Sequence, residues 1–451
     1  MSVVLGSYLK TTFACVLVVC LALLGVVLSV RSLPDAAAAV IAALGLIAAF
    51  CGAVLACAGL LVLDRYQRGV HGKRDLFLEL NRTREPAAIK TAAPRRVSGL
   101  RRWLARRLLG HDLVVGDLVE VRSWAEIRAT LDEQGCLEQL PFMPEMLAMC
   151  GRRAYVFRCA HRLFDYRKSR RMRHMDGAVL LVDAVCSGSA HGGCEASCHT
   201  LWKAAWLKRI EPAEAPASPD RPASVPDRAV LQFGTRAPRY ACQLTQLHAA
   251  SRPIGNWSAV NFLRPLISGN VAPAAFIVGW LTHLFNLLQH YRGGVSFPTF
   301  EEVMPMDRHS EEIHLQAGDR VTVRSSAQIR ATLNDQLIHR GMGFEDDMLK
   351  HCGGQYCVQA EVRKLIDIVT GEMRTMKTPA YLLHDVNFSG ERQLFNAQYE
   401  PLFWRSVWLQ KVRSEEEGGN RPAPAAEITV VSPVVVHARA EHAEQPISRA
   451  G

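Results

Sequence analysis

Several signatures of well-known enzymes are missing from this sequence of 451 residues. It has no glycine-rich phosphate-binding loop, no GxSxG nucleophile elbow and no HExxH metalloprotease helix. Charged residues are few, at 21%, whereas hydrophobic residues reach 49%. A chain of this composition can bury a core, so global disorder is excluded. Its length allows two or three domains, but no motif assigns a reaction to them.

Charge is also absent from two long runs near the N-terminus. Residues 11–30 and 36–63 contain no Asp, Glu, Lys or Arg, and each run reaches the length of about 20 residues that a transmembrane helix needs. Pro34 stands in the short break between them. A cleaved signal peptide is the alternative, but it would have a shorter apolar core and no second span. The sequence therefore predicts a two-helix transmembrane hairpin over residues 1–64.

The formal charge of +10 is concentrated directly after these runs. Residues 64–112 hold 13 Lys or Arg against 5 Asp or Glu. Basic residues beside a span mark its cytoplasmic end, so we expect soluble domains on the cytoplasmic side of the inner membrane. Within this basic linker, assigned to 65–112, residues 97–109 predict a short amphipathic helix. It lies either on an anionic membrane surface or in solvent.

The clearest internal pattern is a repeat. GDLVEVRS at 116–123 returns as GDRVTVRS at 318–325, and the pentapeptide IRATL occurs in both copies. The matching residues further along are Phe142, Met146, Cys150, Trp202 and Trp206 in the first copy and Phe344, Met348, Cys352, Trp404 and Trp408 in the second. We assign the repeats to 113–210 and 313–413, and we expect their matching cysteines and tryptophans to fill the cores.

Each copy begins with an alternating strand, continues with a short helix capped by serine, and ends in further strand-like runs. Several short strands in under 100 residues are typical of a small SH3-like barrel. The predicted fold class is therefore an N-terminal two-helix transmembrane hairpin followed by mainly β (α+β), duplicated small SH3-like barrels. Residues 211–312 are expected to form a linker, rich in Pro and Ala at its start and carrying an amphipathic helix. Residues 414–451 are expected to be a disordered tail.

The helix expected at 271–291 contains no charged residue up to its end. Its apolar stripe comprises Phe276, Ile277, Trp280, Leu281, Leu284, Leu287 and Leu288. Polar residues on the other face, such as His283 and Gln289, favour packing on a domain. Lying on a membrane or crossing it are the alternatives.

Three motifs together resemble a family of uncharacterised bacterial proteins. They are GDLVEVRS, LPFMPEMLAMCG and CSGSAHGGCEASCHTLWKAAWL, the last containing a CxGSAHGGCxxxC loop. The resemblance covers residues 101–412. It implies tandem SH3-like domains and supplies no activity.

One stretch has a pronounced chemical character. Cys186, His191, Cys194 and Cys198 fall within a glycine-rich segment, and Cys242 lies beyond the linker as a further thiolate. Zinc takes four Cys or His ligands, and thiolates also hold iron–sulfur clusters. The sequence therefore predicts a metal site, with zinc favoured over an iron–sulfur cluster. The spacing departs from paired CxxC knuckles.

Other interpretations of the same segment remain open. Its thiols could be free and reduced, as is usual in the cytosol, or Cys194 could be a nucleophile with His191 as its base. A disulfide would need an oxidising compartment. In the second copy the three thiols fall near Asn387, Asn396 and Glu400, so the fold itself does not require them.

These features favour a membrane-anchored, non-enzymatic cytoplasmic scaffold or adaptor with an unknown protein partner and a structural metal. The alternative is a metal- or thiol-dependent enzyme or redox sensor that uses residues 186–198. A nucleic-acid binder is disfavoured, because the basic residues lack the interleaved aromatic platform of single-strand binders.

Overall fold

The structure, a computed structural model, describes residues 86–91, 97–210, 239–254, 259–294, 312–390 and 395–412. The predicted hairpin at 1–64 and the predicted tail at 414–451 lie outside these residues. Strands outnumber helices in the described part of the chain, and the main strands form one sheet in each repeat.

The structural findings contradict the predicted transmembrane hairpin and, with it, the membrane as a partner. None of the described helices combines the length and the apolar character that crossing a membrane requires. The longest of them, α9 (Pro273–Tyr291), carries His283, Asn286 and Gln289 along its length, which lowers its hydropathy. The prediction rested on the two uncharged runs, the break at Pro34 and the basic residues that follow, all of which lie outside the described residues. We therefore propose no membrane anchor.

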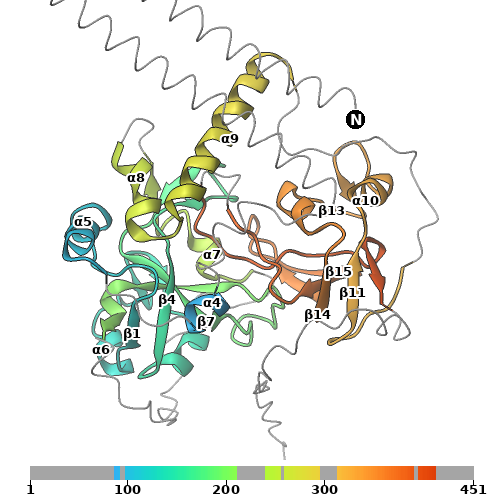
Figure 1. Cartoon of the computed structure of the whole chain (residues 1–451). Helices are drawn as coiled ribbons and strands as arrows, with labels where there is room; N and C mark the ends of the chain where they lie inside the picture. Colours follow the sequence, from blue (N-terminus) through green and yellow to red (C-terminus); the bar gives the residue numbers. More distant parts are fainter. Residues whose placement is uncertain are drawn as a thin grey trace, which may run out of the picture. The chain divides into compact units, whose positions relative to one another are not determined.

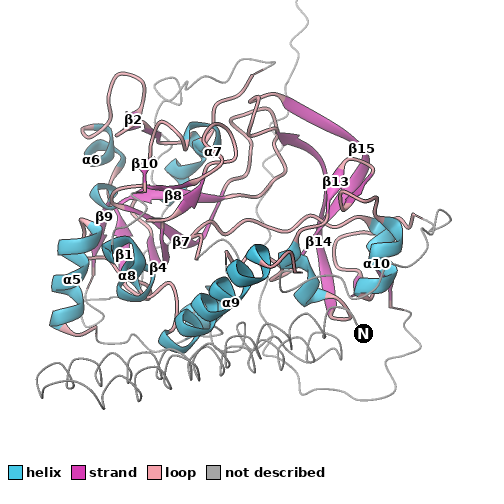
Figure 2. Cartoon of the chain, turned by 90° about the horizontal axis from the view of Figure 1, so that it is seen from above, coloured by secondary structure: helices cyan, strands magenta, loops and turns pink. Residues whose placement is uncertain are grey.

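The first repeat is built on a five-stranded antiparallel sheet with the order β8–β7–β4–β1–β9. Figure 1 labels β1, β4 and β7 of this sheet, and Figure 2 labels β8 and β9 as well. Its strands are β1 (Leu118–Val121), β4 (Arg153–Cys159), β7 (Ala178–Val185), β8 (His199–Lys203) and β9 (Leu207–Arg209). The smaller elements are α6 (Trp124–Arg128), β2 (Cys136–Leu137), β3 (Leu140–Pro141), η2 (Pro144–Met149), β5 (Leu163–Phe164), β6 (Met172–His174) and η3 (Ala204–Trp206). Strand β6 also pairs with β10 (Arg252–Pro253), which lies beyond the linker.

The second repeat is built on a four-stranded sheet with the order β15–β14–β11–β16. Its strands are β11 (Arg320–Val323), β14 (Gln355–Ile366), β15 (Met373–Leu383) and β16 (Leu409–Lys411), and its smaller elements are α10 (Ser326–Thr332), β12 (Ile338–His339), β13 (Met342–Gly343), η6 (Asp346–His351) and η7 (Ser406–Trp408). Strands β14 and β15 form a long hairpin (Figure 2). In place of β8, this copy has two isolated bridges, between Tyr381 and Trp404 and between Asn387 and Pro401.

Each sheet is a half-barrel, not the closed SH3-like barrel predicted from the sequence. The edge strands β8 and β9 of the first sheet do not pair with each other, nor do β15 and β16 of the second. Strands β8 and β9 are successive parts of one segment, joined by η3, and they pair with β7 and β1 at the two ends of the sheet. The predicted fold class is corrected in this respect as well.

Equivalent residues form the two cores, which confirms the expectation for the tryptophans. In the first repeat the ring of Phe142 meets Trp202 and Trp206 edge-on, with centroids 6.0 and 5.2 Å apart. The counterparts in the second repeat are Phe344, Trp404 and Trp408. All four indoles are fully buried. Each Trp lies 202 residues from its twin, so the copies superimpose without insertions between these points.

Both copies also start their first helix in the same way. Ser123 caps α6 and forms a capping box with Glu126, and Ser325 does the same for α10 with Gln328. A capping box satisfies two backbone N–H groups that a helix start leaves unpaired. The short helices therefore form where the sequence places a serine three residues before Glu or Gln.

The predicted basic helix is present as α5 (Gly99–Leu109) and packs on protein. It buries Ala105 and Leu109 beside α8 (Ala259–Ser268). Arg102 donates two hydrogen bonds of 3.0 Å to the carboxylate of Asp117 at the start of the first repeat. Leu100, which belonged to the predicted apolar stripe, is 68% exposed. The helix is thus attached through the side chains of Ala105 and Leu109 and an ion pair.

Helix α9 packs on a domain, as the favoured interpretation held, but through a different face. Its buried residues are Ala275, Val278, Gly279, Thr282, Phe285 and Gln289. The ring of Phe395 from the second repeat stacks on Phe276 and lies against Gly279. Close approach requires small residues at this crossing, so the small-residue face is buried. Ile277, Leu284 and Leu287 of the predicted stripe are exposed.

The two repeats hold each other by reciprocal loop contacts. The backbone N–H of Glu195 donates to the carbonyl of Lys364 at 2.8 Å, and the N–H of Ala397 donates to the carbonyl of Arg162 at 2.7 Å. The two donors, Glu195 and Ala397, occupy equivalent positions in the two repeats, and so do the two acceptors, Arg162 and Lys364. Such reciprocity is typical of an isologous interface between two copies. Each repeat therefore presents a loop to the hairpin region of the other.

Candidate metal centre

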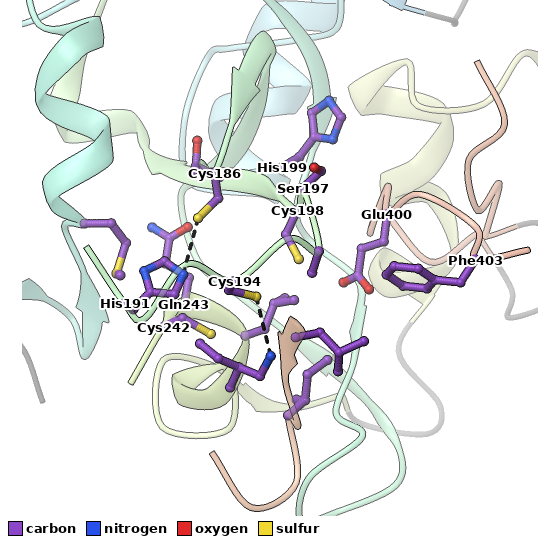
Figure 3. A pocket seen from close by; sticks show the side chains of 17 residues that line it. Cys186, His191, Cys194, Ser197, Cys198, His199, Cys242, Gln243, Glu400 and Phe403 are labelled. Atoms are coloured by element: carbon purple, nitrogen blue, oxygen red, sulfur yellow. Dashed lines mark hydrogen bonds between the residues drawn. The ribbon is translucent and has the colours of Figure 1, made fainter. Parts of the chain in front are cut away.

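The thiol loop (residues 186–198) connects β7 to β8 in the first repeat. Its ends are joined by a hydrogen bond of 2.8 Å from the backbone N–H of Cys186 to the carbonyl of Cys198. Inside the loop, the N–H of His191 donates to the carbonyl of Gly188 at 3.1 Å. These bonds fold the glycine-rich segment back on itself, and its side chains gather around one cavity (Figure 3).

This cavity, the thiol pocket, has a volume of about 100 Å³. All five residues predicted as metal ligands line it: Cys186, His191, Cys194, Cys198 and Cys242. Figure 3 shows their sulfur atoms and the imidazole around a common space. No lysine or arginine is among the described residues that line it. All five therefore face one pocket, but of the predicted set only Cys186 and His191 belong to a group of described donor atoms, with Glu145, that lie within 4.8 Å of one another.

His191 is oriented by a carboxylate that sequence reasoning missed. Its Nδ1 lies 3.1 Å from Oε1 of Glu145, and both side chains are buried. The same oxygen accepts a hydrogen bond of 2.9 Å from the N–H of Ala190. A carboxylate at Nδ1 favours the proton on that nitrogen, which leaves the lone pair on Nε2 for a ligand. Nε2 lies 3.5 Å from Sγ of Cys186.

That spacing is compatible with a shared ion. Two ligands of a tetrahedral zinc, with bonds of about 2.3 Å to sulfur and about 2.1 Å to nitrogen, lie about 3.6 Å apart. Donor atoms of Glu145, Cys186 and His191 all lie within 4.8 Å of one another. Histidines that bind metals commonly donate their other N–H to a carboxylate. The arrangement of His191 is therefore that of a metal ligand with a supporting acid.

Cys242 reaches the pocket on α7 (Gln243–Gln246), beyond the linker. Its backbone N–H donates to Oγ1 of Thr245 at 2.8 Å, which starts the helix. The amide of Gln243 accepts from the N–H of Leu201 at 2.7 Å and donates to the carbonyls of Leu201 and Pro141 at 2.9 and 3.0 Å. These buried bonds fix α7 on the first repeat. Gln243 thereby holds Cys242 at the pocket.

The second repeat supplies the remaining wall. The backbone N–H of Ile366, at the end of β14, points to Sγ of Cys194 at 3.4 Å. The neighbouring Glu195 accepts from the N–H groups of Arg363 and Lys364 at 2.6 and 2.9 Å through Oε2. Glu400 also lines the pocket (Figure 3). The thiol pocket therefore lies between the repeats and is closed by both.

Without a cation, the pocket disfavours the charged forms of its own acids. Burial raises the pKa of Cys186 to about 12 and that of Cys198 well above its ordinary value. Burial also raises the pKa of Cys242 and brings that of Glu400 to about 7. Neighbouring acids add to the shift, since Glu400 raises the pKa of Cys198. A cation in the pocket would reverse these effects, because metal ligands bind as thiolates.

The described ends of the twin loop in the second repeat share two features with the thiol loop but lack its thiols. Gly390 faces the backbone of Asn396 as Gly188 faces that of Cys194. Asp347, the counterpart of Glu145, accepts from the N–H and hydroxyl of Ser389 at 2.6 and 2.9 Å. At a spacing of 202 residues the counterpart of Cys186 is Phe388, where Asn387 was expected. The close approach of Gly390 to Asn396 thus forms without cysteines.

Three other histidines have structural surroundings. His248 lies 2.6 Å from the carboxylate of Asp165, and His174 lies 2.9 Å from Asp176. His161 is buried, and neither of its ring nitrogens has a hydrogen-bond partner. None of the three lines the thiol pocket.

Comparisons with known proteins leave the site to be interpreted from its geometry. No protein-family model, curated protein or solved structure matches the chain. The resemblance to bacterial proteins with tandem SH3-like domains therefore stays a prediction.

Proposed function

We propose that this protein is a non-enzymatic two-repeat scaffold that holds a structural zinc ion in the thiol pocket. The observation that carries the proposal is the convergence of four cysteines and one histidine from two separate segments into one pocket without basic side chains. Cys186 and His191 form the first pair of ligands, and two of the three remaining thiols complete a tetrahedron. The ion neutralises their charge and fastens the thiol loop to α7 beside the second repeat.

The test is the metal content of the full chain, purified anaerobically, with its absorbance spectrum. We expect about one zinc per chain, as a single tetrahedral site requires, and its loss in the Cys194→Ser/Cys198→Ser variant. Cys357→Ser is the matched control, because this half-buried cysteine lies outside the pocket. Iron with sulfide and visible absorbance would replace zinc by an iron–sulfur cluster. Metal-free protein, or zinc retained in the double variant, would contradict the site.

A second candidate function is that of a thiol nucleophile. It is favoured by the spatial arrangement of Cys186, His191 and Glu145, in which the imidazole lies between the thiol and the carboxylate. The separations of 3.5 and 3.1 Å place a thiol, an imidazole and a carboxylate in sequence, as in a catalytic triad. The imidazole partner is Cys186, not Cys194 as the sequence-based alternative held. Rapid alkylation of Cys186 by iodoacetamide at pH 7 in chelator would support this function. Its raised pKa predicts slow alkylation instead.

Gly188→Ala is expected to destabilise the fold by about 2 kcal/mol and to weaken zinc binding. Gly188 has a φ of +68°, and an added Cβ would overlap the backbone of Cys194. The matched control is Gly390→Ala, where φ is +73° and the overlap is with Asn396. Urea unfolding and competition with a zinc indicator measure the two effects. An equal loss of zinc affinity in both variants would contradict the assignment of the metal to the first repeat.

A further inference from the structure

A second and larger cavity, the hairpin cavity, adjoins the thiol pocket. Its volume is about 900 Å³, within the range of roughly 300–1,000 Å³ that is usual for small-molecule sites. It is formed mainly by the second repeat, through the β14–β15 hairpin, the turn between β12 and β13, the start of η6 and residues 398–405. Because methionine side chains are unbranched and polarisable, they adapt to ligands of irregular shape. The apolar wall, which fits the body of an apolar molecule, includes Met342, Met348, Met376, Leu402 and Phe403.

Basic residues outnumber acidic residues in the lining of this cavity. The basic residues are Arg170, Arg340, Arg374, Lys377 and Arg405, and the acidic residues are Glu345, Asp367 and Glu400. Asp367 already pairs with Arg374 at 2.6 Å. Burial raises the pKa of Glu345 and brings that of Glu400 to about 7, so Glu400 is mostly protonated in slightly acidic solution. The lining therefore carries an excess of positive charge.

Arg405 is the buried cation of this lining, at only 4% exposure. Its Nη1 donates to the carbonyls of Thr378 and Pro379, and its Nη2 donates to the carbonyl of Arg340 at 3.0 Å. Its Nε is buried without a hydrogen-bond partner, and its guanidinium forms no ion pair with a described carboxylate. Burial lowers the pKa of Arg405, because a cation that leaves water without a counter-ion is destabilised.

The first repeat has an equivalent cation with a carboxylate beside it. At the spacing of 202 residues, Lys203 is the counterpart of Arg405 and Asp176 is that of Thr378. Nζ of Lys203 donates to the carbonyl of Asp176 at 2.8 Å, just as Arg405 donates to the carbonyl of Thr378. The same Nζ lies 2.6 Å from Oε2 of Glu138. The buried cation of the first repeat is therefore neutralised by the protein itself.

The second repeat lacks this carboxylate. The counterpart of Glu138 is Arg340, and both residues stand in the turn of a short hairpin with a positive φ, of 51° and 45° respectively. Arg340 pairs with Glu312. Its charge adds to the effect of burial on the pKa of Arg405, whereas that of Glu312 opposes it. Compared with the first repeat, one negative charge is therefore missing beside Arg405.

We propose that the hairpin cavity binds an apolar molecule that carries one carboxylate group. The carboxylate pairs with Arg405 as Glu138 pairs with Lys203, and the methionine-rich wall holds the apolar body. A planar guanidinium suits a carboxylate, and a pair in a partly dry cavity is stronger than an exposed one. Arg405 does not line the thiol pocket, so this site does not depend on the metal.

Three probes with one apolar body separate the charge from the shape: 4-phenylbutyrate, 4-phenylbutanol and 4-phenylbutylamine. Isothermal titration of the full chain, as purified, measures their affinities at about pH 6.5, where the carboxylic acid is ionised and the amine is protonated. We expect 4-phenylbutyrate to bind about ten times more tightly than the alcohol, which equals about 1.4 kcal/mol. The amine should bind weakest.

Arg340→Glu gives the second repeat the carboxylate that Glu138 supplies in the first, in a turn that accepts glutamate there. Because the new side chain pairs with Arg405, the affinity for 4-phenylbutyrate should fall about tenfold, while that for the alcohol stays unchanged. The matched control is Arg340→Gln, which also removes the ion pair with Glu312 but adds no carboxylate. It should lower the affinity for 4-phenylbutyrate by less than about threefold.

Arg405→Gln removes the proposed anchor and should abolish the preference for 4-phenylbutyrate over the alcohol. Arg405 also bonds backbone carbonyls, so the Arg340 variants keep the test valid if Arg405→Gln does not fold. Equal affinities for the three probes, tightest binding of the amine, or no binding of 4-phenylbutyrate would each overturn the proposal. So would the same affinity for 4-phenylbutyrate in Arg340→Glu and Arg340→Gln.

Discussion

In the presence of free zinc at 1,000 times its dissociation constant, the chain is expected to gain about 4 kcal/mol in its free energy of unfolding, and Cys194→Ser/Cys198→Ser to gain almost nothing. The gain arises because zinc binds the folded protein, in which the donors from 186–198 and α7 are assembled. In the unfolded chain Cys242 is separated from the thiol loop by the linker, so the site is lost.

Urea unfolding of each protein, with buffered zinc and again with chelator, measures this increment. Comparing the two conditions within one protein removes the direct effect of serine on packing. The Cys357→Ser control should keep the full increment, since its thiol lies outside the pocket. A zinc increment of the same size in the double variant would show that the metal binds elsewhere.

The site could be predicted from sequence as far as its donors are chemically distinctive. Three thiols and a histidine within 13 residues limit their separation, because a short glycine-rich loop cannot carry them far apart. Cys242 could be predicted as a ligand only because it is a further thiol beyond the linker. Gln243, which fixes it, gave no signal because amides are common in loops. Glu145 could have been found by comparing the copies, since Asp347 is the acid at its twin position.

The fold could be predicted where pattern and periodicity agree. The repeat placed the tryptophans in equivalent cores, and serine three residues before Glu or Gln marked both capped helices. The prediction of which face of α9 packs on the domain was wrong. The hydrophobicity of the sequence does not reveal that Gly279 leaves room for the ring of Phe395. Closure of a barrel was also wrong, since it depends on the pairing of short edge strands. Strand pairing over long separations is set by tertiary packing.

The thiol loop and its twin in the second repeat share one role, contact with the other repeat, but only the thiol loop carries cysteines. Both loops hold the other repeat, through Glu195 in one case and Ala397 in the other. Only the first has thiols, while Glu400, the counterpart of Cys198, lines the same pocket from the second repeat. The reciprocal interface therefore places Cys198 of the first repeat and its counterpart in the second, Glu400, at the same pocket. A metal there acts on the contact between the repeats as well as on one loop.

Acidification from pH 6.5 to pH 4 is expected to destabilise the fold through histidines whose pKa burial lowers. One of them is His199, whose pKa falls to about 4. Burial lowers the pKa of His111 to about 4 and that of His161 well below its ordinary value. Unfolded histidine titrates near pH 6.5, so in this range the unfolded chain takes up protons that the fold excludes. Each histidine then contributes a loss that approaches about 1.4 kcal/mol per pH unit.

In part of this pH range, Glu400 contributes to stability with the opposite dependence on pH. Burial raises its pKa to about 7 from an ordinary value of 4.5, so the fold binds a proton that the unfolded chain releases. Its stabilising contribution is complete below pH 4.5 and is lost as the pH rises through 7. On acidification it offsets about one histidine. Three histidines, His111, His161 and His199, have strongly lowered pKa values and outnumber it. The unaltered protein is therefore expected to lose stability on acidification.

Urea unfolding in chelator between pH 4 and pH 7 measures the slope without a contribution from zinc release. His161→Gln removes one of these histidines, so its plot of unfolding free energy against pH should be flatter by about 1.4 kcal/mol per pH unit. The control His384→Gln alters an exposed histidine and should leave the slope unchanged. The slope, and not the absolute stability, is the readout, because a glutamine in the site of His161 also changes packing. An unchanged slope in His161→Gln would show that His161 takes up its proton without unfolding.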